Sequence, residues 1–185
     1  MPSGLLPSIT PTTDSLSAMR FRIEQRYRVI AADVGRALSS VEYLTTAMAE
    51  IPDIGRPEVR SHRIVGDITH LELEYCFGGS LPSVARRVID PAKLSWIEET
   101  SIDASQWTAV FTMTPTHYSS FFRCRGTWHL VQRPSETIRV IEGELKVNSP
   151  VPFVGGQVEK AIVSGLRERL AREPPLLERW VADTA

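Results

Sequence analysis

Apolar and charged residues alternate in the first patterned part of the chain. Phe21, Ile23 and Tyr27 are separated by charged neighbours over residues 20–27. A repeat of two residues is typical of a strand with one buried face, because successive side chains of a strand point to opposite sides. The chain therefore begins its folded part with a strand.

The pattern changes to helical spacing over residues 31–50, where apolar residues recur three and four positions apart. Asp33 stands near the start of this segment as a candidate cap, and a proline follows its end. The spacing predicts one helix, or two short helices broken near Ser39 and Ser40.

Residues 57–77 predict a hairpin with Gly66 and Asp67 at a two-residue turn. The second arm alternates apolar residues with Glu72 and Glu74. These two glutamates are expected on the solvent face, within reach of arginines on the first arm.

Further strands are predicted at residues 93–102, 107–113, 119–132 and 137–147. In the last of them, Ile138 and Val140 break the alternation, which indicates either a bulge or burial on both faces. Gly126 and Gly143 fall on the apolar face of the last two strands. Glycines there indicate a curved sheet, a cavity, or both.

The end of the chain predicts a long helix after Gly155 and Gly156, with Val158, Ile162, Leu166 and Leu170 on one stripe. Pro174 and Pro175 are expected to interrupt it, and the apolar residues 176–181 to form a terminal turn that docks on the body.

The fold class predicted from all these elements is therefore α+β. A curved antiparallel sheet of about six to seven strands surrounds a long C-terminal helix, with two short helices after the first strand.

The chain of 185 residues is long enough for one hydrophobic core. Residues 1–18 are rich in proline, serine and threonine and are predicted to be a disordered leader, so a single domain is expected over residues 19–185. No stretch of 18 apolar residues occurs, so no transmembrane segment is predicted. The sequence makes no prediction of the oligomeric state.

Charge and cysteine content narrow the partners and the compartment. Twenty-one Lys and Arg residues balance 22 Asp and Glu residues, which argues against nucleic acid as a partner. Cys76 and Cys124 resemble reduced core residues more than a disulfide framework, which favours the cytoplasm.

Recognised catalytic motifs are missing from the sequence. There is no G-x-S-x-G elbow, and the glycines before Lys160 do not have the P-loop spacing. The four histidines lack metal-ligand spacing, so neither a metal nor another cofactor is expected. His117, in a predicted loop, is kept as a weak catalytic candidate at the rim of a pocket.

Glu98 is the second weak catalytic candidate. It shares the apolar face of its strand with Leu94 and Trp96, whereas its neighbour Glu99 points to the other face. A carboxyl group on that side needs a partner or a raised pKa, which would suit a general acid or base.

Aromatic residues gather on the same inward face and are candidates to line a ligand cavity. The predicted ligand-binding residues, with the helical positions that face them, are Leu73, Tyr75, Trp96, Trp107, Phe111, Phe122, Trp128, Ile162 and Leu166.

The order of these elements resembles the START-like, helix-grip superfamily of polyketide cyclases and lipid-transfer proteins. RFRIEQRY at residues 20–27, LPSVARR at residues 81–87 and GELKVNSPVPFVGGQVEK at residues 143–160 are similar to a bacterial family of unknown function within it. The resemblance covers residues 19 to about 182. It implies a pocket between the sheet and the C-terminal helix for a mostly apolar molecule.

The sequence thus predicts a protein that binds, and in that way carries or sequesters, a hydrophobic small molecule or lipid. One alternative is an enzyme of the polyketide cyclase or hydrolase type that acts in the same pocket through Glu98 or His117. A further alternative is a non-catalytic domain with a filled core that binds a partner.

Overall fold

The computed structural model describes residues 18–51, 56–76, 86, 90, 93–117, 122–148 and 154–184. The predicted leader therefore lies outside the described residues except for Ala18. The segment 81–87, of which only Arg86 is described, and the proline-containing turn at residues 149–152 fall outside them as well.

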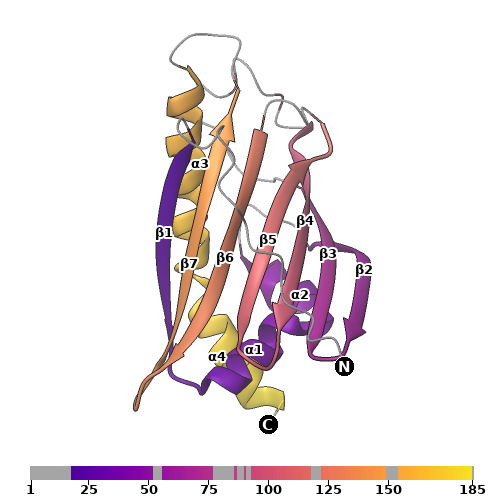
Figure 1. Ribbon diagram of the computed structural model, residues 1–185, viewed down its shortest axis with the longest axis vertical. Helices are drawn as coiled ribbons and strands as arrows, with labels where there is room; N and C mark the ends of the chain where they lie inside the picture. Colours follow the sequence, from indigo (N-terminus) through magenta and orange to yellow (C-terminus); the bar gives the residue numbers. More distant parts are fainter. Residues whose placement is uncertain are drawn as a thin grey trace.

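Within these ranges, seven strands form one antiparallel sheet in the order β1-β7-β6-β5-β4-β3-β2 (Figure 1). The strands are β1 (Met19–Tyr27), β2 (Glu58–Val65), β3 (Ile68–Cys76), β4 (Ser95–Asp103), β5 (Thr108–Pro115), β6 (Phe122–Gln132) and β7 (Thr137–Val147). The predicted strands are all present, and the sheet is strongly curved.

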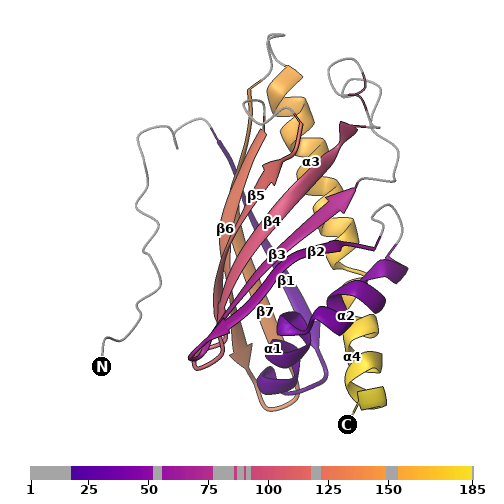
Figure 2. The same ribbon diagram turned by 90° about the vertical axis from the view of Figure 1, so that its right-hand side faces the viewer.

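The helices cover one face of this sheet and one of its ends. They are α1 (Ala31–Ser39), α2 (Val41–Thr46), the 3₁₀ turn η2 (Met48–Glu50), α3 (Val154–Leu170) and α4 (Glu173–Thr184). Figure 2 shows α3 running along the inside of the curved sheet, with α1, α2 and α4 grouped at its lower end. This arrangement is the predicted helix-grip fold.

Two helices, and not one, follow β1. The break is at Ser40, which is extended and whose hydroxyl accepts a hydrogen bond from the N–H of Tyr43 at 3.3 Å, capping α2. The prediction of Asp33 as a cap is wrong, because the capping position of α1 is Ile30, which is extended and makes no side-chain cap hydrogen bond. Asp33 lies inside that turn and pairs with Arg36 instead.

The β2–β3 hairpin has the predicted register, with Arg63 opposite His70 and Gly66 at a φ of 59° in the turn. The pairing shifts between Val59 and Ser61, so Arg60 forms a bulge. The side chain of Arg60 reaches across to Glu74, with Nε 2.8 Å from a carboxylate oxygen.

Ile138 and Val140 are buried on the outer face of β7, at 3% and 4% exposure, while Ile141 is buried on the inner face. The register of β7 runs without a shift against both β1 and β6. Of the two predicted explanations, burial on both faces is therefore the one found.

Gly126 and Gly143 lie directly opposite each other on β6 and β7. A Cβ atom at Gly126 would be 2.6 Å from the ring of Phe111, and one at Gly143 would be 2.5 Å from the ring of Phe21. The two glycines therefore make room for phenylalanine rings of the chain itself on the inner face of the sheet.

The C-terminal helical segment breaks at Ala171 and Arg172, before the prolines. Pro174 and Pro175 lie in the first turn of α4, where a missing N–H costs no helical hydrogen bond. The prolines thus begin a second helix, and the predicted terminal turn is a helix of 12 residues.

Candidate functional site

A cavity of about 80 Å³ lies between the inner face of the sheet and the helices. It is lined by α1, α2 and η2 residues (Leu38, Leu44, Met48), by sheet residues (Leu71, Leu73, Tyr75, Glu98, Thr100, Ile102, Phe111, Met113, Trp128, Arg139, Ile141) and by residues around the α3–α4 junction (Leu166, Arg169, Leu170, Glu173). Most of the lining is apolar, but four charged side chains also face this space.

The structure brings five of the predicted ligand-binding residues to this cavity: Leu73, Tyr75, Phe111, Trp128 and Leu166. They come from three strands and from α3, and the period-two pattern places each strand residue on the inner face. Glu98, predicted to share that face, also lines the cavity.

The other predicted residues lie elsewhere. Trp96 stacks on Tyr75, with ring centroids 5.5 Å apart, and Phe122 and Ile162 pack against the core. None of these three side chains lines this cavity. His117 is exposed beyond the end of β5 and lies away from the cavity.

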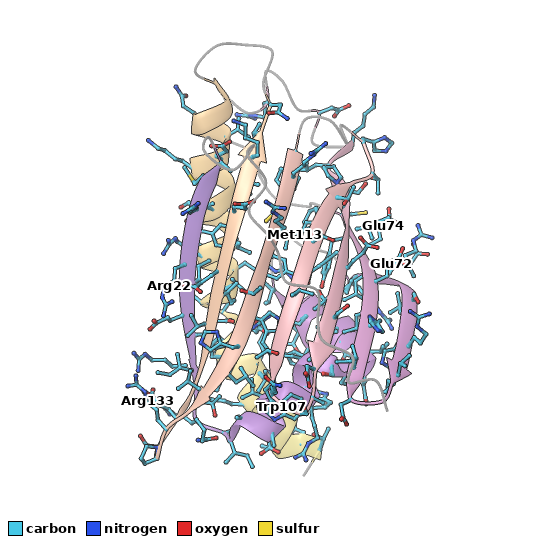
Figure 3. The ribbon with its side chains drawn as sticks, viewed as in Figure 1. Arg22, Glu72, Glu74, Trp107, Met113 and Arg133 are labelled. Atoms are coloured by element: carbon cyan, nitrogen blue, oxygen red, sulfur yellow. The ribbon has the colours of Figure 1, made fainter. Side chains whose placement is uncertain are left out.

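Trp107 also lies away from the cavity, at the end of the sheet near α1, as Figure 3 shows. It precedes β5 and has a φ of 52°, in the left-handed region, so strand alternation does not apply to it. Its indole ring lies against Gly35, where a Cβ atom would be only 2.0 Å from the ring. The ring packs α1 onto the end of the sheet.

Charged side chains cover the opposite, outer face of the sheet. Arg22 on β1 and Glu72 and Glu74 on β3 project from it near its two edges (Figure 3). Arg22 pairs with Glu142 at 2.5 Å, and both side chains are more than half exposed. Apart from Ile138 and Val140 on β7, this face is largely solvated, and the charged groups that line the cavity are on the inner face.

The first inner polar group is Glu173, at the start of α4, which is 1% exposed. One of its carboxylate oxygens accepts a hydrogen bond from Gln25 at 2.8 Å and lies 3.4 Å from Nη1 of Arg139. The other accepts a hydrogen bond from the hydroxyl of Tyr43 at 3.4 Å. Gln25 also donates to the carbonyl of Leu170 at 2.7 Å, so this network joins β1, β7, α2 and the α3–α4 junction.

Arg139 projects inward from β7 and is charged. Burial lowers its pKa, but Glu173, Tyr27 and Glu98 together more than offset this, so that the pKa is raised overall. The guanidinium lies over the ring of Trp128, 4.8 Å from its centroid. Its Nε atom is buried and has no hydrogen-bond partner.

Arg169 enters the cavity from α3. Its guanidinium lies over the ring of Tyr75, 5.1 Å from the centroid, and its Nε atom is likewise buried without a partner. Among the described residues, Arg169 forms no salt bridge.

Glu98 faces the cavity from β4, opposite Leu73 and Met113 on the neighbouring strands. Its carboxyl group accepts a hydrogen bond from the hydroxyl of Thr100 at 3.3 Å. Burial raises the pKa of Glu98, and the nearby Arg169 opposes this rise without cancelling it. Protonation of Glu98 is therefore favoured by the fold.

Glu98→Gln is expected to raise the melting temperature at pH 8 more than at pH 4.5. A raised folded-state pKa contributes stability that is full below the unfolded-state value and is lost as pH rises through the folded-state value. The substituted amide cannot ionise and escapes this loss. We expect a difference of several degrees by circular dichroism, since about 1 kcal/mol shifts a domain of this size by roughly 2–4 °C.

Glu99→Gln is the matched control, because Glu99 is the next residue of β4 and its side chain is exposed on the other face. Its effect is expected to be similar at both pH values. An equal effect of Glu98→Gln at both pH values would contradict the raised pKa.

Sequence reasoning missed Gln25, Arg139, Arg169 and Glu173. Their positions carried a signal, because Arg139 lies two residues before the inward Ile141 on β7. Arg169 follows Leu166 at helical spacing on α3, and Glu173, the first residue of α4, lies seven residues after Leu166. Their charge made them look like surface residues, since charged residues are rarely buried unless paired.

In the ranges that the structure describes, no three His, Cys, Asp or Glu side chains are placed to hold a metal ion. No helix there is long and apolar enough to cross a membrane. Cys76 is exposed and Cys124 is buried, and both are free thiols.

Comparison with known proteins places the chain in a family. The model of the family described as "Protein of unknown function (DUF2505)" matches residues 22–181, so the chain belongs to that family. No curated protein matches the sequence.

Solved structures share the fold at low sequence identity. The Zhui aromatase/cyclase from Streptomyces sp. R1128 is 10% identical, with a TM-score of 0.62 over 89% of this chain and 94% of its own. A norcoclaurine synthase point mutant from Thalictrum flavum is 16% identical, with a TM-score of 0.55 over 91% and 98%. A START superfamily protein from Mycobacterium smegmatis is 15% identical, with a TM-score of 0.52 over 90% and 99%. The chain therefore has the helix-grip fold of START-like proteins, which the aromatase/cyclase and the norcoclaurine synthase also have.

Proposed function

We propose that this protein binds a small, mostly apolar molecule in the cavity between the sheet and α3. The observation that carries the proposal is the cavity itself, about 80 Å³ in the interior and lined mainly by apolar side chains. A filled-core domain that only binds partners predicts no such space. We place this function in a single START-like domain over residues 19–185, working in the cytoplasm.

The size of the cavity sets the size of the ligand. An apolar cavity of roughly 150 Å³ can hold benzene, so a cavity of about 80 Å³ has room for a few waters or one small ring that fits closely. Sites for drug-sized ligands are usually larger, about 300–1,000 Å³. The proposed ligand is therefore a compact ring or the end of a longer molecule, bound by apolar burial worth roughly 25 cal/mol per Å².

The test combines native mass spectrometry of freshly purified protein with thermal-shift titrations of small aromatics, quinones and fatty acids. A ligand that binds only the folded state at 100 times its Kd adds about 2.7 kcal/mol, a rise of several degrees in the melting temperature. We expect a co-purified molecule or a concentration-dependent rise for compact aromatic ligands.

Leu166→Phe, which narrows the cavity from α3, is expected to remove this rise. Leu176→Phe is the matched control, because Leu176 is partly buried on α4 but does not line the cavity. A measured mass equal to that of the chain alone, together with no thermal shift across the panel, would contradict the proposed function.

An enzyme acting in the same cavity is the second candidate, and the position of Glu98 favours it. A carboxyl group with a raised pKa that lines a cavity is suited to act as a general acid. If a bound ligand is converted, Glu98→Gln is expected to retain binding and to lose turnover.

A further inference from the structure

Two guanidinium groups share the proposed ligand cavity, and each has an open edge, meaning that its Nε atom has no hydrogen-bond partner. Arg139 and Arg169 each lie over an aromatic ring, of Trp128 and Tyr75 respectively, which holds the guanidinium by one face. The Nε atom of each is buried without a hydrogen-bond partner. A buried donor without a partner is costly, so a ligand that brings an acceptor to these Nε atoms would be stabilised there.

The charges that line the cavity do not balance when Glu98 is protonated. Glu173 is already engaged by Arg139, Gln25 and Tyr43. Glu98 has its pKa raised by burial and is therefore biased toward its neutral form. This leaves the positive charge of Arg169 without a carboxylate within salt-bridge distance in the described chain.

A guanidinium with a free Nε edge matches a carboxylate. Its N–H groups form a planar fork that can bind two oxygens side by side, and such charge-assisted pairs are roughly twice as strong as neutral hydrogen bonds. One unbalanced positive charge in a mostly apolar space suits a monoanion better than a doubly charged phosphate.

We propose that the cavity is specific for a small apolar carboxylate, whose ring or chain packs among the apolar lining residues and whose carboxylate binds the open edge of Arg169. This inference rests on the proposed function and adds the chemical class of the ligand. Arg169 is then a specificity-determining residue. Arg139 remains the partner of Glu173 and adds its Nε atom to the same positively charged end of the cavity.

The test compares three ligands that share one ring: benzoate, benzamide and benzyl alcohol. Their binding to the full chain is measured by calorimetry at fixed pH and ionic strength. We expect benzoate to bind about 10- to 100-fold more tightly than benzamide, the range expected for a hydrogen bond to a charged group. Arg169→Gln is expected to remove this preference.

Arg167→Gln is the matched control, because Arg167 is exposed on the same helix two residues away. It is expected to keep the preference for benzoate. If Arg169→Gln does not fold, as judged by circular dichroism, the comparison of benzoate with benzamide in the unmodified protein still decides the question.

Equal affinity for benzoate and benzamide would overturn the inference and leave the proposed function standing. Loss of the preference in Arg167→Gln as well would overturn the role of Arg169. No binding of any of the three, together with no response to the wider panel, would overturn the proposed function along with the inference.

Discussion

Arg139→Met is expected to lower the free energy of unfolding by about 3–5 kcal/mol, the usual cost of removing one partner of a buried ion pair. Glu173 is 1% exposed, and among the described residues its carboxylate would lose its cationic partner. The loss of the stacking of Arg139 on Trp128 adds to this cost. Equilibrium denaturation in urea measures the change.

The double variant Arg139→Met/Glu173→Gln is expected to recover much of this loss, because no uncompensated charge remains in the core. Arg179→Met is the surface control. It breaks the pair of Arg179 with Glu50, whose side chains are both about half exposed, and should cost no more than about 1 kcal/mol. Equal losses for the buried and exposed variants would contradict the structural role of the Arg139–Glu173 pair.

Gly126→Ala is expected to destabilise the protein by about 3 kcal/mol or more, at the upper end of overpacking effects. The added Cβ atom would lie 2.3 Å from the backbone oxygen of Glu142 and 2.6 Å from the ring of Phe111. The ring can turn aside, but the backbone of the paired strand cannot move without disturbing the register of β6 and β7. Thermal and urea denaturation both report the loss.

Gly165→Ala is the matched control for the same chemical change. Gly165 lies inside α3, and a Cβ atom there would meet nothing within 4 Å. Alanine favours a helix over glycine by about 1 kcal/mol, so this variant should be slightly more stable than the parent. A loss for Gly165→Ala as large as that for Gly126→Ala would contradict the close packing described at the Gly126–Gly143 pair.

The fold was predictable because most of its strands have one buried and one solvated face. Alternation over residues 20–27 gives the buried and exposed faces of β1, and the turn at Gly66 gives the pairing of Arg63 with His70 in the β2–β3 hairpin. Prediction failed at two positions where the local backbone conformation departs from what the residue pattern indicates. Trp107 adopts a left-handed conformation before β5, and Asp33 lies inside a helix that starts without a side-chain cap.

The candidate site was only half predictable, for a related reason. Its apolar residues could be predicted from the alternation of side chains along each strand and from their size, both of which a sequence shows directly. Its charged part depends on pairs such as Gln25 with Glu173, which are 148 positions apart in sequence and meet only in the folded chain. A pattern of single residues cannot show that a charge will be neutralised by a distant partner.

The free edge of the sheet has a consequence for the behaviour of the protein in concentrated solution. β2 is an outer strand of the sheet, and apart from Val59 all its residues are exposed. An edge strand that is straight and apolar would be a template for fibril growth, because its backbone N–H and C=O groups are unpaired. The bulge at Arg60 interrupts that template, and the charged side chains along β2 would lose solvation against an added strand. The same arginine that binds Glu74 thus protects the folded chain against aggregation.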